Sequence, residues 1–405
     1  MERVRVAVVG GGQAGLATSA ELARAGLEHV VLERQRVGQS WRDRWDSFCL
    51  VTPNWTMHLP DHPYDGDDPD GYVPRDDIVW YLEDYATAVG APVREGVEVG
   101  ALSREDDGFI LDTSAGPLHA EEVVLATGTY RRPHRPAGAV GLPDDLLAID
   151  VVDYRNPDAL PPGDVLIVGS GQSGCQLAEE LTLAGRQVVL ACGRAPFVPR
   201  RIAGHDVIWW AVESGFMDMT LGQLPAPEAR LWGNATATGH GGGHDLSPRT
   251  LRALGVTLAG RFLGADGHVA RFAADLAETM AWNDESTRQF MELVRDTAAA
   301  RGMPPVEIEP APPFDPTSPE EVDLRGFGAV VFAGGFRPDY GACVPWEGAL
   351  DADGYPIHVD GASTVVEGLS FVGAHFLRTR KSSLLFGVGE DAAVVARGVA
   401  ARLGA

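Results

Sequence analysis

Two glycine-rich runs carry the clearest chemical signal in this sequence. The first, Gly10-Gly11-Gly12-Gln13-Ala14-Gly15, follows residues 3–9, which alternate between arginine and valine and then run apolar, and precedes a helical pattern over residues 16–25. In such a strand–turn–helix unit, Gly10 would allow the tight turn, Gly12 would let the backbone approach a pyrophosphate, and Gly15 would let the helix pack on the sheet. The amino end of the helix attracts phosphates. The run therefore predicts a dinucleotide site.

An acidic residue completes this first unit. Residues 30–32 form a second apolar strand, and Glu33 stands at its end, 18 positions after Gly15. A carboxylate at this place accepts hydrogen bonds from the ribose hydroxyls of an adenosine. We therefore expect Glu33 and the adjacent Arg34 at the adenosine half of the dinucleotide. The motif alone does not separate FAD from NAD.

The second run, Gly169-Ser170-Gly171-Gln172-Ser173-Gly174, follows an apolar strand at residues 164–168. Its unit differs from the first at the end of the next strand, where Cys192-Gly193-Arg194 replaces the acid. An acid would repel a 2′-phosphate, whereas an arginine can pair with it. The second run thus predicts NADPH with Arg194 at the 2′-phosphate, and NADH remains an alternative. Arg200 and Arg201 are either further phosphate ligands or solvent-facing side chains.

Both runs belong to a duplicated unit. Each has a downstream apolar strand ending in Ala-x-Gly, at Ala126-Thr127-Gly128 and at Ala333-Gly334-Gly335. Gly10 and Ala126 are 116 positions apart, whereas Gly169 and Ala333 are 164 apart, so the second unit has about 48 additional residues. We predict an α/β fold with two Rossmann-like dinucleotide-binding domains of three layers.

The same comparison predicts the domain limits. Residues 1–157 and 338–405 would form the FAD-binding domain, and residues 158–337 the NADPH-binding domain, with a partly helical insertion at about 203–319. Within this insertion, residues 207–210 and Phe216, Met217 and Met219 would line a substrate cavity or a subunit interface, or pack in the core. Residues 304–319 contain seven prolines, which indicates an extended linker.

The overall composition excludes several classes of protein. Lysine and arginine number 33 against 57 aspartates and glutamates, a net charge of −24 that repels nucleic acid and anionic membranes. No apolar run is long enough to span a bilayer, and no signal peptide pattern occurs at the start, so we expect a cytoplasmic protein. The four cysteines are scattered without metal spacing, and the glycines within His240-Gly241-Gly242-Gly243-His244 argue against a metal site there.

Further motifs resemble those of the bacterial flavoproteins related to flavin-containing monooxygenases, often described as CzcO-like, over nearly the whole chain. The motifs that carry this resemblance are Ser40-Trp41-Arg42 with Arg44-Trp45-Asp46-Ser47, Thr52-Pro53-Asn54-Trp55, Gly71-Tyr72-Val73-Pro74-Arg75, Asp153-Tyr154-Arg155-Asn156-Pro157 and residues 381–391. In one respect the chain departs from the monooxygenases. Of their FxGxxxHxxx(Y/F) fingerprint only Tyr154 is present, because Asp150 stands at the histidine position.

The resemblance implies FAD at the first motif and NADPH at the second. It places residues 39–45 along the FAD, an active-site asparagine at Asn54, and the helix that opens near residues 383–389 with its amino end toward the flavin. The FAD ligands predicted on both grounds are Gly10, Gly12, Gln13, Ala14, Gly15, Glu33, Arg34, Gln39, Ser40, Trp41, Thr127, Gly128, Gly389 and Asp391. The predicted NADPH ligands are Gly169, Ser170, Gly171, Gln172, Ser173, Gly174 and Arg194.

The resemblance also implies an activity, namely NADPH-dependent oxygenation of a small molecule with O2 through a C4a-peroxyflavin. Oxygenation at sulfur, at nitrogen or of the Baeyer–Villiger type is left open, as is a homodimer. One alternative is an NAD(P)H oxidase or reductase without productive oxygen transfer. Others are a dithiol–disulfide oxidoreductase, which needs two cysteines beside the flavin, and a non-catalytic nucleotide-sensing subunit.

Overall fold

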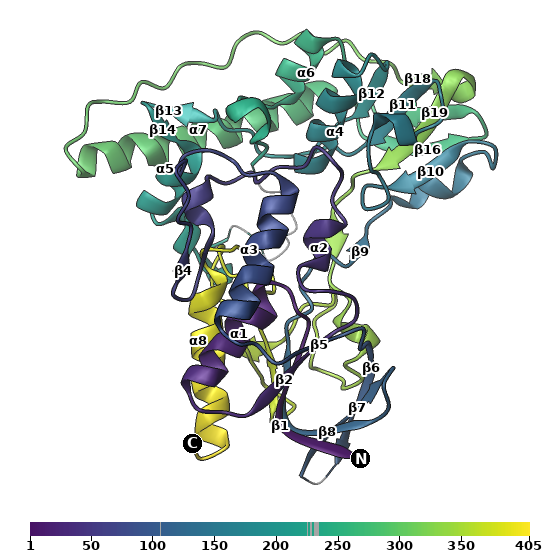
Figure 1. Ribbon diagram of the computed structural model, residues 1–405. Coiled ribbons are helices and arrows are strands. Elements are labelled where there is room, and N and C mark those ends of the chain that lie inside the picture. Colours follow the sequence, from purple (N-terminus) through teal and green to yellow (C-terminus); the bar gives the residue numbers. More distant parts are fainter. Residues whose placement is uncertain (106, 225, 227–228, 231–234) are drawn as a thin grey trace.

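The computed structural model describes residues 1–105, 107–224, 226, 229–230 and 235–405, and contains two main sheets (Figure 1). The amino and carboxyl ends both lie at the bottom of the view, beside the first sheet. The second sheet lies at the top with the middle part of the chain. No helix in the described ranges is long and apolar enough to cross a membrane.

The first sheet is built around a buried central strand, β1 (Glu2–Val9), with parallel neighbours on both sides. Val6, Ala7 and Val8 are fully buried, as expected of a strand with both faces covered. The strand order is β21 (His358–Val359), β22 (Ala362–Ser363), β23 (Leu369–Phe371), β8 (Leu118–Leu125), β1, β2 (His29–Glu33) and β5 (Val93–Glu95). Strand β23 pairs with β8, so the end of the chain returns to the first sheet.

Helices and a β-ribbon cover this sheet. Helix α1 (Gln13–Arg24) packs against α8 (Val388–Arg402) and α3 (Arg75–Ala88) on the same side in Figure 1. The ribbon pairs β6 (Val99–Glu105) with β7 (Gly108–Thr113), and β7 joins β8 in antiparallel fashion. The remaining short elements here are α2 (Gln39–Arg42), β3 (His58–Leu59) and β4 (His62–Pro63).

The second sheet repeats this plan with five parallel strands. Their order is β10 (Leu147–Asp150), β19 (Phe327–Phe332), β11 (Asp164–Val168), β12 (Val188–Ala191) and β15 (Thr257–Ala259). Strands β11, β12, β15 and β19 correspond in order to β1, β2, β5 and β8, and α4 (Gln172–Leu183) corresponds to α1. The prediction of two Rossmann-like units is confirmed.

Other elements surround the second sheet. They are β13 (Arg201–Ile202), β14 (His205–Asp206), α5 (Val207–Glu213), α6 (Pro248–Leu254), β16 (Phe262–Asp266), β17 (Val269–Phe272), α7 (Leu276–Ala300) and β18 (Glu321–Asp323). Short 3₁₀ turns occur at Asn54–Thr56, Ala137–Gly141, Pro157–Ala159, Phe216–Asp218, Leu221–Gln223, His240–Gly242, Leu324–Gly326 and Tyr340–Ala342. The chain from residue 301 to 320 has no helix or strand and runs around the outside of the second unit in Figure 1.

The structure corrects two of the expected limits. Strand β10 lies within residues 1–157 but pairs with β19, so the second sheet takes in chain before residue 158. Residues 203–319 are only in part an insertion, because β15 pairs with β12 as a member of the sheet. In both cases a short strand is held by a partner far away in the sequence. The two units are joined where β9 (Arg132–Pro133) pairs with β20 (Phe336–Arg337).

Candidate active site

The first glycine turn is shaped by two close backbone approaches and one open position. Gly10 has φ +113°, and a Cβ there would lie 2.6 Å from the carbonyl oxygen of Ala126. A Cβ on Gly15 would lie 1.8 Å from the carbonyl oxygen of Gly10. A Cβ on Gly12 would meet nothing within 4 Å. Gly12 is also the N-cap of α1 and provides no capping side chain, which leaves the first N–H groups of the helix for a phosphate.

Glu33 is held at the end of β2 with its carboxylate facing the glycine turn. The side chain is 9% exposed, and its Oε2 accepts a hydrogen bond from the Gly11 N–H at 2.7 Å. Its Oε1 accepts from the Gln35 N–H at 3.0 Å. Each oxygen keeps a lone pair, so the carboxylate can also accept ribose hydroxyls. Arg34 beside it is exposed.

Gln13 joins three segments at the start of α1. Its Nε2 donates to the carbonyl oxygen of Ser383 at 3.1 Å, and its Oε1 accepts from Trp41 Nε1 at 2.9 Å. A Cβ on Gly373 would lie 2.5 Å from the Cβ of Ala14. The return of the chain through residues 373–383 is therefore packed against the first glycine turn.

The other predicted FAD ligands lie in surroundings that differ from one residue to the next. Thr127 and Gly128 follow β8, whose carboxyl end lies beside that of β1, where dinucleotides bind in open parallel sheets. Ser40 is exposed, and Gln39 donates to Asp43 Oδ1 at 2.9 Å. Gly389 packs toward Pro60, since a Cβ there would lie 3.0 Å from Pro60 Cγ.

Asp391 is buried in the first turn of α8. It is 1% exposed, and its Oδ1 accepts from Arg378 Nη1 at 3.3 Å. Burial raises its pKa to about 6, against the pairing with Arg378 and Ser382, which lowers it. Its Oδ2 is buried without a hydrogen-bond partner among the described residues. Its contact with FAD stays a prediction.

Asn54 has both ends of its amide engaged with backbone. Its Nδ2 donates to the carbonyl oxygen of Asp68 at 2.8 Å, and its Oδ1 accepts from the Val73 N–H at 2.7 Å. The residue is 2% exposed. These bonds give Asn54 a structural role in closing the loop between residues 54 and 73. Its contact with the flavin stays a prediction.

The second glycine turn reproduces the first. Gly169 has φ +114°, and a Cβ there would lie 2.6 Å from the Ala333 carbonyl oxygen. A Cβ on Gly174 would lie 1.8 Å from the Gly169 carbonyl oxygen, and one on Gly171 would meet nothing within 4 Å. Gly171 likewise caps α4 without a side chain. The same turn geometry is thus present twice.

The side chains around this second turn are held by the chain, except for one arginine that has no partner among the described residues. Ser170 Oγ donates to the Gly193 carbonyl oxygen at 3.1 Å and fixes the end of β12, while Ser173 is half-buried. Gln172 exchanges two hydrogen bonds with the backbone of Ala237. Arg194 is exposed and makes no side-chain hydrogen bond or ion pair with any described residue. Its pairing with a 2′-phosphate stays a prediction.

Arg200 has neither of its expected roles. It is 1% exposed, and its Nη2 lies 2.7 Å from Asp206 Oδ2. Its Nε donates to the hydroxyl of Tyr72 at 2.9 Å, and its Nη1 donates to the carbonyl oxygen of Val51 at 2.7 Å. Tyr72 OH in turn donates to Asp206 at 2.5 Å. Arg200 therefore connects the second unit to a loop of the first, and no sequence pattern predicted its partners Tyr72 and Asp206.

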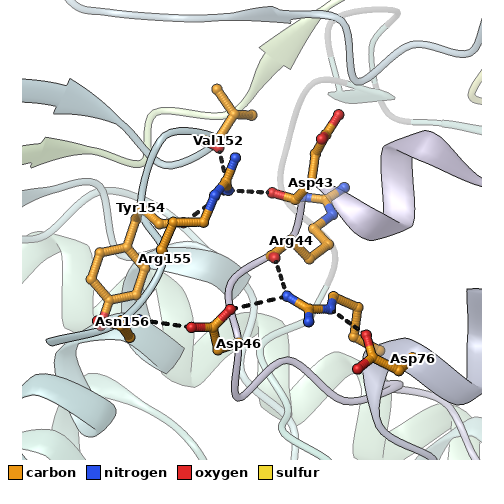
Figure 2. A network of polar contacts seen from close by, with 9 residues as sticks. Asp43, Arg44, Asp46, Asp76, Val152, Tyr154, Arg155 and Asn156 are labelled. Carbon is orange, nitrogen blue, oxygen red and sulfur yellow. Dashed lines mark hydrogen bonds and ion pairs between the residues drawn. The ribbon is translucent and has the colours of Figure 1, made fainter. Parts of the chain in front are cut away.

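A second connection uses several of the motifs quoted above (Figure 2). Asp46 accepts from Asn156 Nδ2 at 2.7 Å and from Arg75 Nη1 at 3.2 Å. Arg155 Nη1 donates to the carbonyl oxygen of Asp43 at 2.7 Å. Tyr154, the one fingerprint residue present, donates to Glu180 of α4 at 3.1 Å. These motif residues hold the entry to the second unit against residues 43–46, which is positioning rather than chemistry.

The cysteines do not form a redox pair. All four lie in the described part of the chain and are free and buried. Burial raises the pKa of each thiol, to about 12 at Cys192 and about 11 at Cys343. Thiols held in the protonated form are poor nucleophiles.

Two groups of histidine and acidic side chains are paired within the chain. His244 lies 2.6 Å from Glu179. Glu105, Asp107 and His119 lie close together, and Asp107 also pairs with Arg3.

Comparison with known proteins places the chain in a family. Residues 7–201 match the model described as pyridine nucleotide-disulphide oxidoreductase. An uncharacterized CzcO-like oxidoreductase of Geobacillus kaustophilus is 31% identical over 394 residues, which is 96% of each chain. The chain belongs to the CzcO-like oxidoreductases. The resemblance inferred from the motifs is thereby confirmed.

More distant matches have monooxygenase names. Indole-3-pyruvate monooxygenase YUCCA1 of Oryza sativa subsp. japonica is 30% identical over 203 residues, 49% of this chain and 50% of that protein. A flavin-containing monooxygenase from Stenotrophomonas maltophilia has a similar structure, with a TM-score of 0.70, 19% identity and full coverage of both chains. At this identity the likeness supports the fold of this CzcO-like chain.

Proposed function

We propose that this CzcO-like oxidoreductase is an NADPH-dependent flavin monooxygenase that uses FAD and O2 to oxygenate a small molecule. The observation that carries the proposal is the pair of matching glycine turns, each with an open middle glycine and an uncapped helix end. This pair of turns supports the proposal of two dinucleotides, one on each sheet. The monooxygenase names of the more distant relatives support the reaction type.

The residues of the chain bind and orient the two cofactors. The α1 turn and Glu33 would hold FAD, and the α4 turn and Arg194 would hold NADPH. When bound, FAD supplies hydride acceptance, oxygen activation and oxygen transfer, chemistry that requires no nucleophilic side chain. The remaining task of the protein is to hold the two cofactor sites at a fixed relative position and to exclude water from them. The Asp46 and Arg200 networks serve the first of these tasks.

Oxidase or reductase activity without oxygen transfer is the second candidate, since it requires the same two cofactors. A dithiol mechanism is disfavoured because all four thiols are buried, unpaired and of raised pKa. The two candidates differ in where oxygen goes, into a product or into hydrogen peroxide.

Rapid mixing would decide between them. The FAD-loaded protein is reduced with NADPH without air, mixed with oxygenated buffer, and followed by flavin absorbance. A spectrum that is neither oxidised nor reduced and persists for seconds, followed by oxygen incorporation into an added amine, sulfide or ketone, supports the monooxygenase. Prompt reoxidation with stoichiometric hydrogen peroxide in the presence of each of these compounds favours the oxidase.

A further inference from the structure

Residues 373–383 run between the first glycine turn and the middle segment of the chain. Ser383 accepts from Gln13 of the glycine turn at 3.1 Å. On the other side, Arg380 N–H donates to the carbonyl oxygen of Met219 at 2.9 Å, and Lys381 N–H donates to that of Met217 at 3.2 Å. Arg380 thus stands where a segment carried by the second unit meets the proposed flavin side of the first.

The guanidinium of Arg380 lies against two aromatic rings and has no acidic partner among the residues that the structure describes. Its Cζ lies 4.1 Å from the ring centre of Phe216 and 4.9 Å from that of Phe376. Its side chain makes no hydrogen bond or ion pair with any residue that the structure describes, and its Nε is buried without a partner. Burial lowers its pKa to about 10, so it remains a cation at neutral pH.

The neighbouring basic residues show that acids are available in this region. Arg378 lies 3.3 Å from Asp391, and Lys381 lies 2.8 Å from Asp218. Arg230, which is also close to His375, lies 2.6 Å from Asp351. Each of these cations is neutralised by the chain itself. Among the described residues, Arg380 has no such counter-ion, although a partly buried charge without one is unfavourable.

Two further features set Arg380 apart as a prepared site. Phe376 is buried and has φ +55°, a conformation that bulky residues avoid and that is more frequent at active sites, ligand clamps and switch regions than elsewhere. His375 has its pKa lowered to about 4 by burial and by Arg380 and Arg230. It is therefore neutral at pH 7 and adds no second positive charge.

We propose that Arg380 binds a carboxylate group of the substrate, and that the molecule oxygenated at this site is a small organic acid. The rings of Phe216 and Phe376 lie against the guanidinium, whose N–H groups at its edge can bind a carboxylate through two parallel hydrogen bonds. Phe216 comes from the middle segment, which gives that segment a role in substrate recognition. The proposal names the substrate class for the monooxygenase proposed above and rests on that function.

Calorimetric titration of the oxidised, FAD-loaded protein tests the site without requiring oxygen transfer. The probes are 4-(methylthio)benzoate and its neutral isostere 4-(methylthio)benzamide. We expect the wild type to bind the acid more tightly than the amide. Arg380→Gln should weaken binding of the acid about 10- to 100-fold and leave the amide unchanged. Arg380→Lys, which keeps the charge but not the planar fork, should give an intermediate loss.

Arg104→Gln is the matched control. Arg104 also stacks on a phenylalanine, with its Cζ 4.7 Å from the ring centre of Phe109, and makes no ion pair among the described residues. It lies on β6, and its substitution should change neither affinity. Wild-type affinities that are equal for acid and amide would overturn the proposal, and so would equal losses of both in Arg380→Gln or release of FAD by that variant. If the acid is selectively bound but never oxygenated, the monooxygenase assignment fails and the anion site stands.

Discussion

At each glycine turn, the middle glycine is the position where an added methyl group meets no protein atom within 4 Å. Gly12 and Gly171 also have φ of −85° and −72°, which alanine adopts without strain. Substitution here should therefore disturb a bound pyrophosphate and spare the fold. Gly15 is different, because a Cβ there would lie 1.8 Å from a backbone oxygen.

We predict that Gly12→Ala lowers FAD content, whereas Gly171→Ala keeps its FAD and raises the KM for NADPH. A loss of about 1.4 kcal/mol of binding free energy at the phosphates lowers the affinity about tenfold. Flavin absorbance per protein and steady-state kinetics measure the two effects. Both apo variants should melt like the wild type, while Gly15→Ala should melt at lower temperature. FAD loss in Gly171→Ala would contradict the assignment of the two turns.

Arg194 provides a second prediction at this scale. Arg194 is exposed and pairs with no described residue. Its side chain can therefore affect nucleotide binding only by contacting the nucleotide. Arg194→Gln should raise the KM for NADPH about tenfold, because a charge-assisted hydrogen bond to the 2′-phosphate is lost. The KM for NADH should hardly change. Initial rates with both nucleotides measure this, and parallel losses for the two would place Arg194 away from the 2′-phosphate.

Asp391 should make stability depend on pH. Its pKa is raised from the usual 3.8 to about 6 by burial, so the folded protein binds this proton more tightly than the unfolded chain. The stability given by the protonated form is complete below about pH 4 and is lost as the pH rises through about 6.

Asp391→Asn removes that charge. The apo variant should be more stable than the apo wild type at pH 8, on the order of 1 to 3 kcal/mol, with a smaller difference at pH 5. Urea unfolding at the two pH values measures it. A variant that is destabilised more at pH 8 than at pH 5 would mean that the ionised carboxylate stabilises α8.

At the scale of elements, the sequence predicts those strands whose apolar runs are continuous and next to a glycine turn. Residues 6–9 of β1 and 165–168 of β11 are such runs; both are buried, and both strands lie in the interior of their sheets. The residues of β10 are exposed or half-buried in the structure. Its partner β19 lies about 180 residues further along the chain. Its place in the second sheet depends on that distant pairing, which no local pattern shows.

The same reason explains which site residues the sequence could supply. The glycines and Glu33 are set by the geometry of one turn, and their spacing alone reveals it. Arg200 depends on Tyr72, 128 positions away, and Arg380 depends on Phe216, 164 positions away. The position of an arginine in the sequence does not show whether its side chain is exposed or buried when its partners lie in the other unit.

At the scale of the whole molecule, the relative position of the two units decides whether hydride can pass from one nucleotide to the other. Beyond the β9–β20 pair, the contacts that hold the units together include the Asp46 network and Arg200. The Arg200 contact is buried and ionic. Breaking one partner of such a pair costs about 3 to 5 kcal/mol, since the other charge is left without compensation.

We predict that Arg200→Met strongly lowers thermal stability and slows flavin reduction by NADPH. In the double variant Arg200→Met/Asp206→Asn, no unpaired charge remains, and the amide oxygen can still accept from the Ile208 N–H as the carboxylate does at 2.8 Å. Its stability should therefore recover in large part. Flavin reduction, followed by stopped-flow absorbance under anaerobic conditions, should stay slow, because the bond to Val51 of the first unit is absent in both variants. Recovery of the reduction rate together with stability would mean that Arg200 serves folding alone, and the register of the two nucleotides would then depend on the Asp46 network.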